Sequence, residues 1–305
     1  MGNDDTRQNL KERKMCNEIL LRRPTNELVI MFDNFWGNGV GKDQEFYLFE
    51  NENGQPVEEH KILIRKDGLV KICNKVVIDF EAIKQGEELL NEVFAKIGLW
   101  KNYSNDQAGL YEAILLLDRI YSTHLEDPYR YSVRLKKYIN DLSQDVSVEN
   151  IARIDLESDD NRGKGIYSYS FATKICNRIE PNKFPIYDSY VAGLLIWFRD
   201  NGDEYNNIPN KDAFKEFVLS NKKDKNRHFY DYELANYETY KNKYNMFKNM
   251  FNLDLTYQQL DRFLWTYAKM VFRYKQLYPQ PLDNTYEPKY LDYKYIASQV
   301  SANIS

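Results

Sequence analysis

The decisive stretch for the fold is NRGKGIYSYSFATKICNRIEPNKFPIYDSYVAGLLIWF, residues Asn161–Phe198. It begins with the glycine-bearing turn Gly163-Lys164-Gly165. A helix over 166–179 is expected next, because apolar side chains recur there at helical spacing, at Phe171, Ile175 and Ile179. The segment EPNKFP ends this helix, since proline cannot continue it. Asp188 then opens a second, apolar helix over 189–200. The stretch therefore predicts two helices joined by a proline-containing loop.

Toward the N-terminus the pattern changes from helices to strands. Between Glu27 and Phe80, five short runs are rich in Val, Ile and aromatic residues: ELVIMF, EFYLFE, HKILIRK, LVKIC and VVIDF. Hairpin turn signals separate the later runs at Asn53–Gly54, Asp67–Gly68 and Asn74–Lys75. We therefore expect an antiparallel sheet in this region, preceded by a polar lead-in.

The chain from residue 81 onward has the apolar spacing of helices. Besides the two helices above, we predict helices over 81–97, 107–123, 129–143, 147–154, 211–219, 232–251 and 256–275. The expected fold class is α+β, with an N-terminal antiparallel β-sheet followed by a mostly helical body. We expect two domains: residues 1–80 form the lead-in and the sheet subdomain, and residues 81–305 form the helical domain.

Composition narrows the class of protein and its compartment. The chain has 305 residues, a net charge of −4, three histidines and three widely spaced cysteines, Cys16, Cys73 and Cys176. An odd number of distant cysteines argues against a disulfide framework and fits a reducing compartment. No apolar run reaches the roughly 18 residues of a membrane span, and the polar N-terminus does not resemble a signal peptide. We expect a cytoplasmic protein with no membrane partner.

Two motifs suggest phosphate or metal chemistry and are set aside. The segment GNGVGK, Gly37–Lys42, is similar to a phosphate-binding loop. However, Trp36 takes the place of the first glycine and Asp43 that of Ser or Thr, so we expect a connection between two strands. The acids of DLESDD, residues 155–160, leave a metal-dependent nuclease as an alternative function, although a solvated loop fits their spacing better.

The order of parts in Asn161–Phe198 resembles that of the helix-hairpin-helix DNA glycosylases, and the N-terminal sheet is similar to their 8-oxoguanine branch. In that family a Gly-x-Gly hairpin binds DNA phosphates, and a loop after a proline carries the catalytic aspartate. The resemblance implies a hairpin at Gly163–Ser168 and a catalytic loop at Pro185–Val191 within the helical domain. It further implies double-stranded DNA with a flipped base as partner, bound by Arg162, Gly163, Lys164 and Gly165.

Asp188 takes the place of the catalytic aspartate in this resemblance. Breaking an N-glycosidic bond develops positive charge on the sugar, and a fixed carboxylate stabilises that charge. An aspartate directly before a helix is also an ordinary N-cap, and that role alone explains the residue type. The residues expected to surround the flipped base are Tyr167, Tyr169, Ser170, Tyr187 and Tyr190.

Bifunctional members of the family use a lysine that forms a Schiff base with the sugar. The family's spacing back from Asp188 places this lysine at Ser170, and alignment on the hairpin places it at Tyr167. Lys174 lies one helical turn beyond Ser170 and is the alternative nucleophile. We therefore predict a monofunctional glycosylase that uses water, leaves an abasic site, needs no cofactor and acts as a monomer.

The identity of the excised base stays open at this point. Damaged purines and modified phage bases both fit, so that base-excision repair and anti-phage defence are both compatible with the sequence. Two alternatives come from other classes of protein. One is a catalytically silent DNA-binding or regulatory protein of the same fold, and the other is the metal-dependent nuclease.

Overall fold

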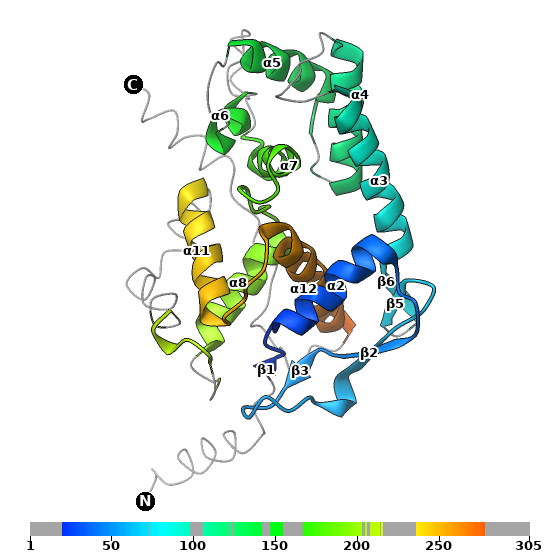
Figure 1. The fold of residues 1–305 in the computed structure, drawn as a ribbon, viewed down its shortest axis with the longest axis vertical. Helices are drawn as coiled ribbons and strands as arrows, with labels where there is room; N and C mark the ends of the chain where they lie inside the picture. The colour runs from blue at the N-terminus through cyan, green and yellow to red at the C-terminus, as the bar shows by residue number, and fades with distance from the viewer. Residues whose placement is uncertain are drawn as a thin grey trace, which may run out of the picture.

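The computed structural model describes residues 20–72, 74–97, 106–121, 123, 125–141, 147–154, 167–202, 205, 208–213, 215 and 236–277. Its fold is the expected α+β class, with an antiparallel sheet near the N-terminus and a mostly helical body after it (Figure 1). None of the helices in this part of the chain combines the length and the apolarity that a membrane crossing requires.

The main sheet has four antiparallel strands in the order β2-β4-β5-β6, formed by Gln44–Tyr47, Lys61–Ile64, Leu69–Ile72 and Lys75–Asp79. Gly68 and Asn74, two of the expected turn residues, have positive φ angles of 82° and 62°. Such angles suit Gly and Asn better than other residues. A separate two-stranded sheet pairs β1 (Leu20–Leu21) with β3 (Phe49–Glu50). The run EFYLFE is therefore divided between two sheets.

The first expected strand, ELVIMF, is instead part of helix α2, Asn26–Asn38. Thr25 is its N-cap, with Oγ1 accepting a hydrogen bond from the Leu28 N–H at 3.3 Å. The buried side chains lie at helical spacing on one face, at Leu28, Val29, Phe32, Phe35 and Trp36. The strand prediction was wrong because the apolar run over 28–32 fits either structure, and the side chains that distinguish a helix, Phe35 and Trp36, lie beyond it. The glycine-rich segment Gly37–Lys42 consequently contains the end of α2 and leads toward β2, rather than joining two strands.

Replacing Thr25 with alanine should lower the free energy of unfolding by about 1 kcal/mol. The reason is that the Leu28 N–H loses its side-chain acceptor. Urea denaturation followed by circular dichroism measures the change. Thr25→Ser keeps the hydroxyl and serves as the control, and its free energy of unfolding should stay close to the wild-type value because serine caps helices at least as well as threonine. Equal losses in the two variants would contradict the capping role.

The helical body begins at the end of the sheet. Its helices are α3 (Phe80–Ile97), α4 (Gln107–Tyr121), α5 (Pro128–Asp141), α6 (Val148–Arg153), α7 (Tyr169–Ile179), α8 (Ser189–Asn201), α11 (Tyr237–Met250) and α12 (Tyr257–Leu277). Each overlaps a helix that the sequence predicts. The predicted helices over 211–219 and 232–251 extend into residues outside the described ones.

Helix α12 joins the two parts of the fold. It packs against α2, α8 and strand β6, and Figure 1 shows it between α2 and α8. The Phe32 ring centroid of α2 lies 5.3 Å from Phe46, 6.3 Å from Phe80 and 5.6 Å from Phe263 of α12. Large aromatic side chains contribute much of a core's stabilisation, so this cluster fixes α12 against the N-terminal elements. The division into two domains at residue 80 stays a prediction.

Candidate functional site

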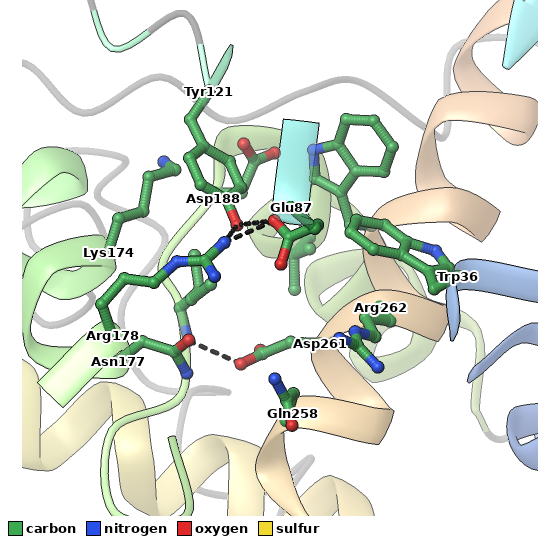
Figure 2. Close-up of a pocket in the computed structure, with 13 residues that line it drawn as sticks. Trp36, Glu87, Tyr121, Lys174, Asn177, Arg178, Asp188, Gln258, Asp261 and Arg262 are labelled. Carbon is green, nitrogen blue, oxygen red and sulfur yellow. Dashed lines mark hydrogen bonds and ion pairs between the residues drawn. The ribbon is translucent and has the colours of Figure 1, made fainter. Parts of the chain in front are cut away.

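A pocket lies where α2, α3, α4, α7 and α12 meet the loop before α8 (Figure 2). It encloses about 490 Å³ of space, part of which is open solvent. Its lining combines three aromatic residues, Trp36, Tyr121 and Trp265, with charged groups from α3, α7 and α12. Asp188 and Lys174, the two residues that the sequence nominates for catalysis, both line this pocket.

Asp188 lies directly before α8. Its Oδ1 accepts a hydrogen bond from the Tyr190 N–H at 2.9 Å, so the residue is the N-cap of that helix. A helix N-terminus carries partial positive charge, which attracts a nearby carboxylate. Burial lowers the pKa of Lys174 and of Lys269, and the negative charge of Asp188 opposes this effect at both lysines. Asp188 therefore caps a helix and also contributes its charge to the pocket.

The loop Phe184–Tyr187, which leads into Asp188, is held by side chains. Each of its four carbonyls accepts a side-chain hydrogen bond, and the donors are Asn177, Tyr237, Tyr240, Ser170 and Lys174. The N–H groups of Ile186 and Tyr187 donate to Asp261 and Thr173, respectively. Buried backbone groups that are all satisfied leave a loop few alternative conformations. Helices α7, α11 and α12 thus fix the position of Asp188 before a ligand arrives.

Lys174 is buried, with 2% of its surface exposed. Its Nζ donates to Ser170 Oγ at 2.6 Å, and lies 3.4 Å from the carbonyl oxygens of Ser170 and Tyr187. Burial lowers the pKa of this lysine to about 8, because the ammonium loses its hydration. At neutral pH most of the population is still charged, and this form donates the hydrogen bonds that hold the loop.

Asp261 is a second pocket carboxyl group, and the sequence analysis did not identify it. Only 7% of its surface is exposed. Its two oxygens accept hydrogen bonds from the Tyr244 hydroxyl at 2.7 Å and from the Ile186 N–H at 3.0 Å. Burial raises its pKa to about 8. Below that pH Asp261 is predominantly a neutral acid.

A buried ion pair between Arg178 of α7 and Glu87 of α3 forms another wall (Figure 2). The Tyr121 hydroxyl of α4 donates to Glu87 at 2.7 Å and lies 2.6 Å from Arg178. Arg178 also donates to Asn91 at 3.0 Å. This network fixes three helices relative to one another around the pocket.

None of the residues nominated to surround the flipped base is among the described residues that line the pocket: Tyr167, Tyr169, Ser170, Tyr187 and Tyr190. The Tyr187 ring packs against Tyr169 and Tyr240, with centroid distances of 5.1 and 5.4 Å. Tyr167 stacks on Tyr169 at 5.9 Å, and Ser170 accepts a hydrogen bond from Lys174. The Tyr190 ring lies 5.1 Å from that of Phe272. Their contact with a base stays a prediction, and the aromatic residues that line the pocket are on α2, α4 and α12.

The expected DNA-binding hairpin, with Arg162, Gly163, Lys164 and Gly165, lies outside the described residues. The acids at 155–160 that suggest a nuclease also lie outside them. Within the described part of the chain, no group of three His, Cys, Asp or Glu side chains could hold a metal ion.

Among the pocket residues that sequence reasoning missed, Asp261 has a signal that can be recognised in the sequence. Asp261 belongs to the buried face of α12 that includes Leu260, Leu264 and Ala268. Lys174 likewise interrupts the buried face of α7. A charged residue on an apolar helical stripe is costly to bury without partners, so such interruptions indicate an internal polar site. Nothing local to Trp36 or Glu87 distinguishes them from core and surface residues.

Comparison with known proteins gives limited information. No family model matches the chain, and no solved structure matches it. A protein of Haemophilus influenzae, described as "Uncharacterized protein", is 36% identical over 110 residues. The matched region covers 36% of this chain and 41% of that protein, so it spans less than half the length of either.

Proposed function

We propose that this chain is a monofunctional DNA glycosylase that excises a damaged or modified base with water and leaves an abasic site. The observation that supports this proposal most directly is the placement of Asp188. Its carboxylate lines a pocket, caps a helix and follows a loop whose backbone groups are all hydrogen-bonded. A carboxylate held in this way suits a reaction in which positive charge develops on a sugar.

The chemistry assigns Asp188 a defined role. As the bond between the base and C1′ breaks, the sugar becomes an oxocarbenium-like cation, and the carboxylate attracts it. At about 4 Å and an effective dielectric constant of about 20, this attraction is roughly 4 kcal/mol, or nearly three decades in rate. The hydroxyl of a water molecule then bonds to C1′, and its proton passes through Asp188 to the departing base.

The pocket walls suit a flipped base. A base taken out of the DNA stack needs aromatic or apolar side chains that replace the lost stacking. Trp36, Tyr121 and Trp265 supply aromatic surface, and Asn177 and Gln258 supply amides for hydrogen bonds to the edge of the base. Double-stranded DNA is accordingly the proposed partner, and no cofactor has a role in this mechanism.

The test is a base-release assay on DNA carrying damaged purines and on DNA carrying phage-type modified bases. Each reaction is run with and without EDTA, and half of each sample is treated with alkali. A monofunctional glycosylase yields free base and strand breaks only after alkali, in the presence or absence of EDTA. Repair and defence roles are distinguished by which of the two DNAs loses its base.

The same assay separates the two alternatives. A silent DNA-binding protein retards the DNA in a gel but releases no base and gives no alkali-labile sites. A metal-dependent nuclease cuts without alkali and loses this activity in EDTA. Either result would overturn the proposal.

Borohydride should trap little protein on DNA at neutral pH. Trapping requires an imine between the sugar and a neutral amine, whereas Lys174 has a pKa of about 8 and donates its protons to Ser170 and Tyr187. Crosslinked protein is measured on denaturing gels between pH 7 and pH 9. Strong trapping that rises through pH 8 and disappears in Lys174→Gln would instead identify Lys174 as the nucleophile.

A further inference from the structure

The two tryptophan walls of the pocket already have protein cations beside them. The Arg262 guanidinium carbon lies 5.5 Å from the centroid of Trp36, and Lys269 Nζ lies 5.1 Å from that of Trp265. The two indoles are in edge-to-face contact, with centroids 5.7 Å apart. Both distances to the cations are within the range of a cation–π interaction.

The third aromatic wall, Tyr121, also has cationic side chains beside its ring. Lys174 Nζ lies 5.6 Å from its centroid, and the Arg178 guanidinium carbon lies 5.7 Å from it. Figure 2 shows Tyr121 with Lys174 and Arg178 close by, and Arg262 on the opposite side of the pocket near Trp36. Every aromatic wall of the pocket thus has a cationic side chain of this chain near its ring.

The carboxylates offset part of this positive charge without removing it. Glu87 neutralises Arg178, and Asp33, which lies outside the lining, is 2.6 Å from Arg262 and neutralises it, so the remaining positive charge comes from Lys174 and Lys269. Asp261 is neutral over most of its population below pH 8. Asp188 is the remaining pocket carboxylate, and its negative charge acts on two lysines, Lys174 and Lys269, by raising the pKa of each.

We propose that this pocket selects uncharged bases and rejects cationic ones, such as purines alkylated on a ring nitrogen. The inference rests on the proposed glycosylase function and specifies its substrate class. A cationic base would have to approach rings that are already near ammonium or guanidinium groups, and the like charges repel at these distances. An uncharged base stacks on the same rings without this cost.

The test uses pairs of bases with the same shape and different charge. One pair is N7-methylguanine, a cation, and 7-methyl-7-deazaguanine, which is neutral. The other pair is N1-methyladenine, a cation, and N1-methylhypoxanthine, which is neutral. Each is placed in a duplex on a 2′-fluoro sugar that suppresses bond cleavage, at mildly acidic pH so that the cations are fully charged. Dissociation constants are then measured for the wild-type protein.

The neutral member of each pair should bind at least about tenfold more tightly than the cationic member. Equal affinities within both pairs, or tighter binding of the cations, would overturn the inference. The base-release assay is read independently on DNA with ordinary sugars. Release of no base from any substrate would overturn the proposed function, whereas base release together with equal affinities within both pairs would overturn only the selectivity.

Two variants assign the selectivity to named side chains. Arg262→Met and Lys269→Met should each reduce the neutral-to-cationic ratio at least about threefold, because each removes one positive charge beside a tryptophan. Arg273→Met is the matched control, since Arg273 is on the same helix and bonds to Gln276 outside the pocket. Thermal unfolding verifies that each variant is folded. An unchanged ratio in folded Arg262→Met and Lys269→Met would contradict the assignment.

Discussion

Replacing Asp188 with asparagine should lower the rate of base excision by at least about 100-fold. The variant keeps the size of the side chain but loses the negative charge that stabilises the sugar cation. Asparagine is also a good N-cap, so its side-chain oxygen can still accept the hydrogen bond from the Tyr190 N–H. Single-turnover release of base, measured at saturating protein, isolates the chemical step from binding.

A matched variant, Asp106→Asn, controls for the loss of a capping carboxylate. Asp106 accepts hydrogen bonds from the Ala108 and Gly109 N–H groups at the start of α4. The pocket residue Tyr121 is at the other end of this 15-residue helix, roughly 20 Å away. Asp106→Asn should therefore excise bases at the wild-type rate. Full activity of a folded Asp188→Asn protein would remove Asp188 from the mechanism.

The sequence predicts most of the fold because its signals are local. Helical periodicity identifies the helices after residue 80, and hairpin dipeptides place the turns at Gly68 and Asn74. The exception is α2, where five apolar residues in a row, Leu28–Phe32, fit a strand or a helix equally well. The capping contact of Thr25 and the burial of Trp36 identify this segment as a helix. The burial of Trp36 depends on packing against α12, which the local sequence does not show.

The candidate site can be predicted only in part from the sequence, because local signals identify residues that are close together in the chain and miss contacts between distant ones. Asp188 and Lys174 lie on one continuous stretch, so local reasoning brings them together. By contrast, Asp261 is 75 residues from its partner Ile186, and Glu87 is 91 residues from Arg178. Contacts over such separations are set by tertiary packing, which a single sequence does not reveal.

The tyrosines near Asp188 were predicted from residue type and sequence position alone. A base pocket needs aromatic side chains, and Tyr187 and Tyr190 are close to Asp188 in the sequence. The structure adds the packing of Tyr187, which is buried against Tyr240, whose hydroxyl donates to the Ile186 carbonyl at 2.7 Å. A tyrosine inside a core needs a partner for its hydroxyl. The loop before α8 provides such partners, because its Pro185 and Ile186 carbonyls accept hydrogen bonds from tyrosine hydroxyls.

Replacing Arg178 with methionine should lower the free energy of unfolding by about 3–5 kcal/mol. Arg178 and Glu87 are 8% and 10% exposed in their side chains, so the variant leaves a buried carboxylate without its cation. The Tyr121 hydroxyl still donates to Glu87, but one neutral hydrogen bond does not replace a paired charge. Urea denaturation at neutral pH gives the free energy.

Two comparisons show whether burial is the cause. Lys183→Met breaks the pair with Glu180, whose side chains are 47% and 49% exposed, and should cost at most about 1 kcal/mol. The double variant Arg178→Met with Glu87→Met removes both buried charges and should recover most of the loss, because no isolated carboxylate remains. If Arg178→Met costs no more than Lys183→Met, or the double variant is less stable than the single one, the buried pair does not hold α3 and α7 together.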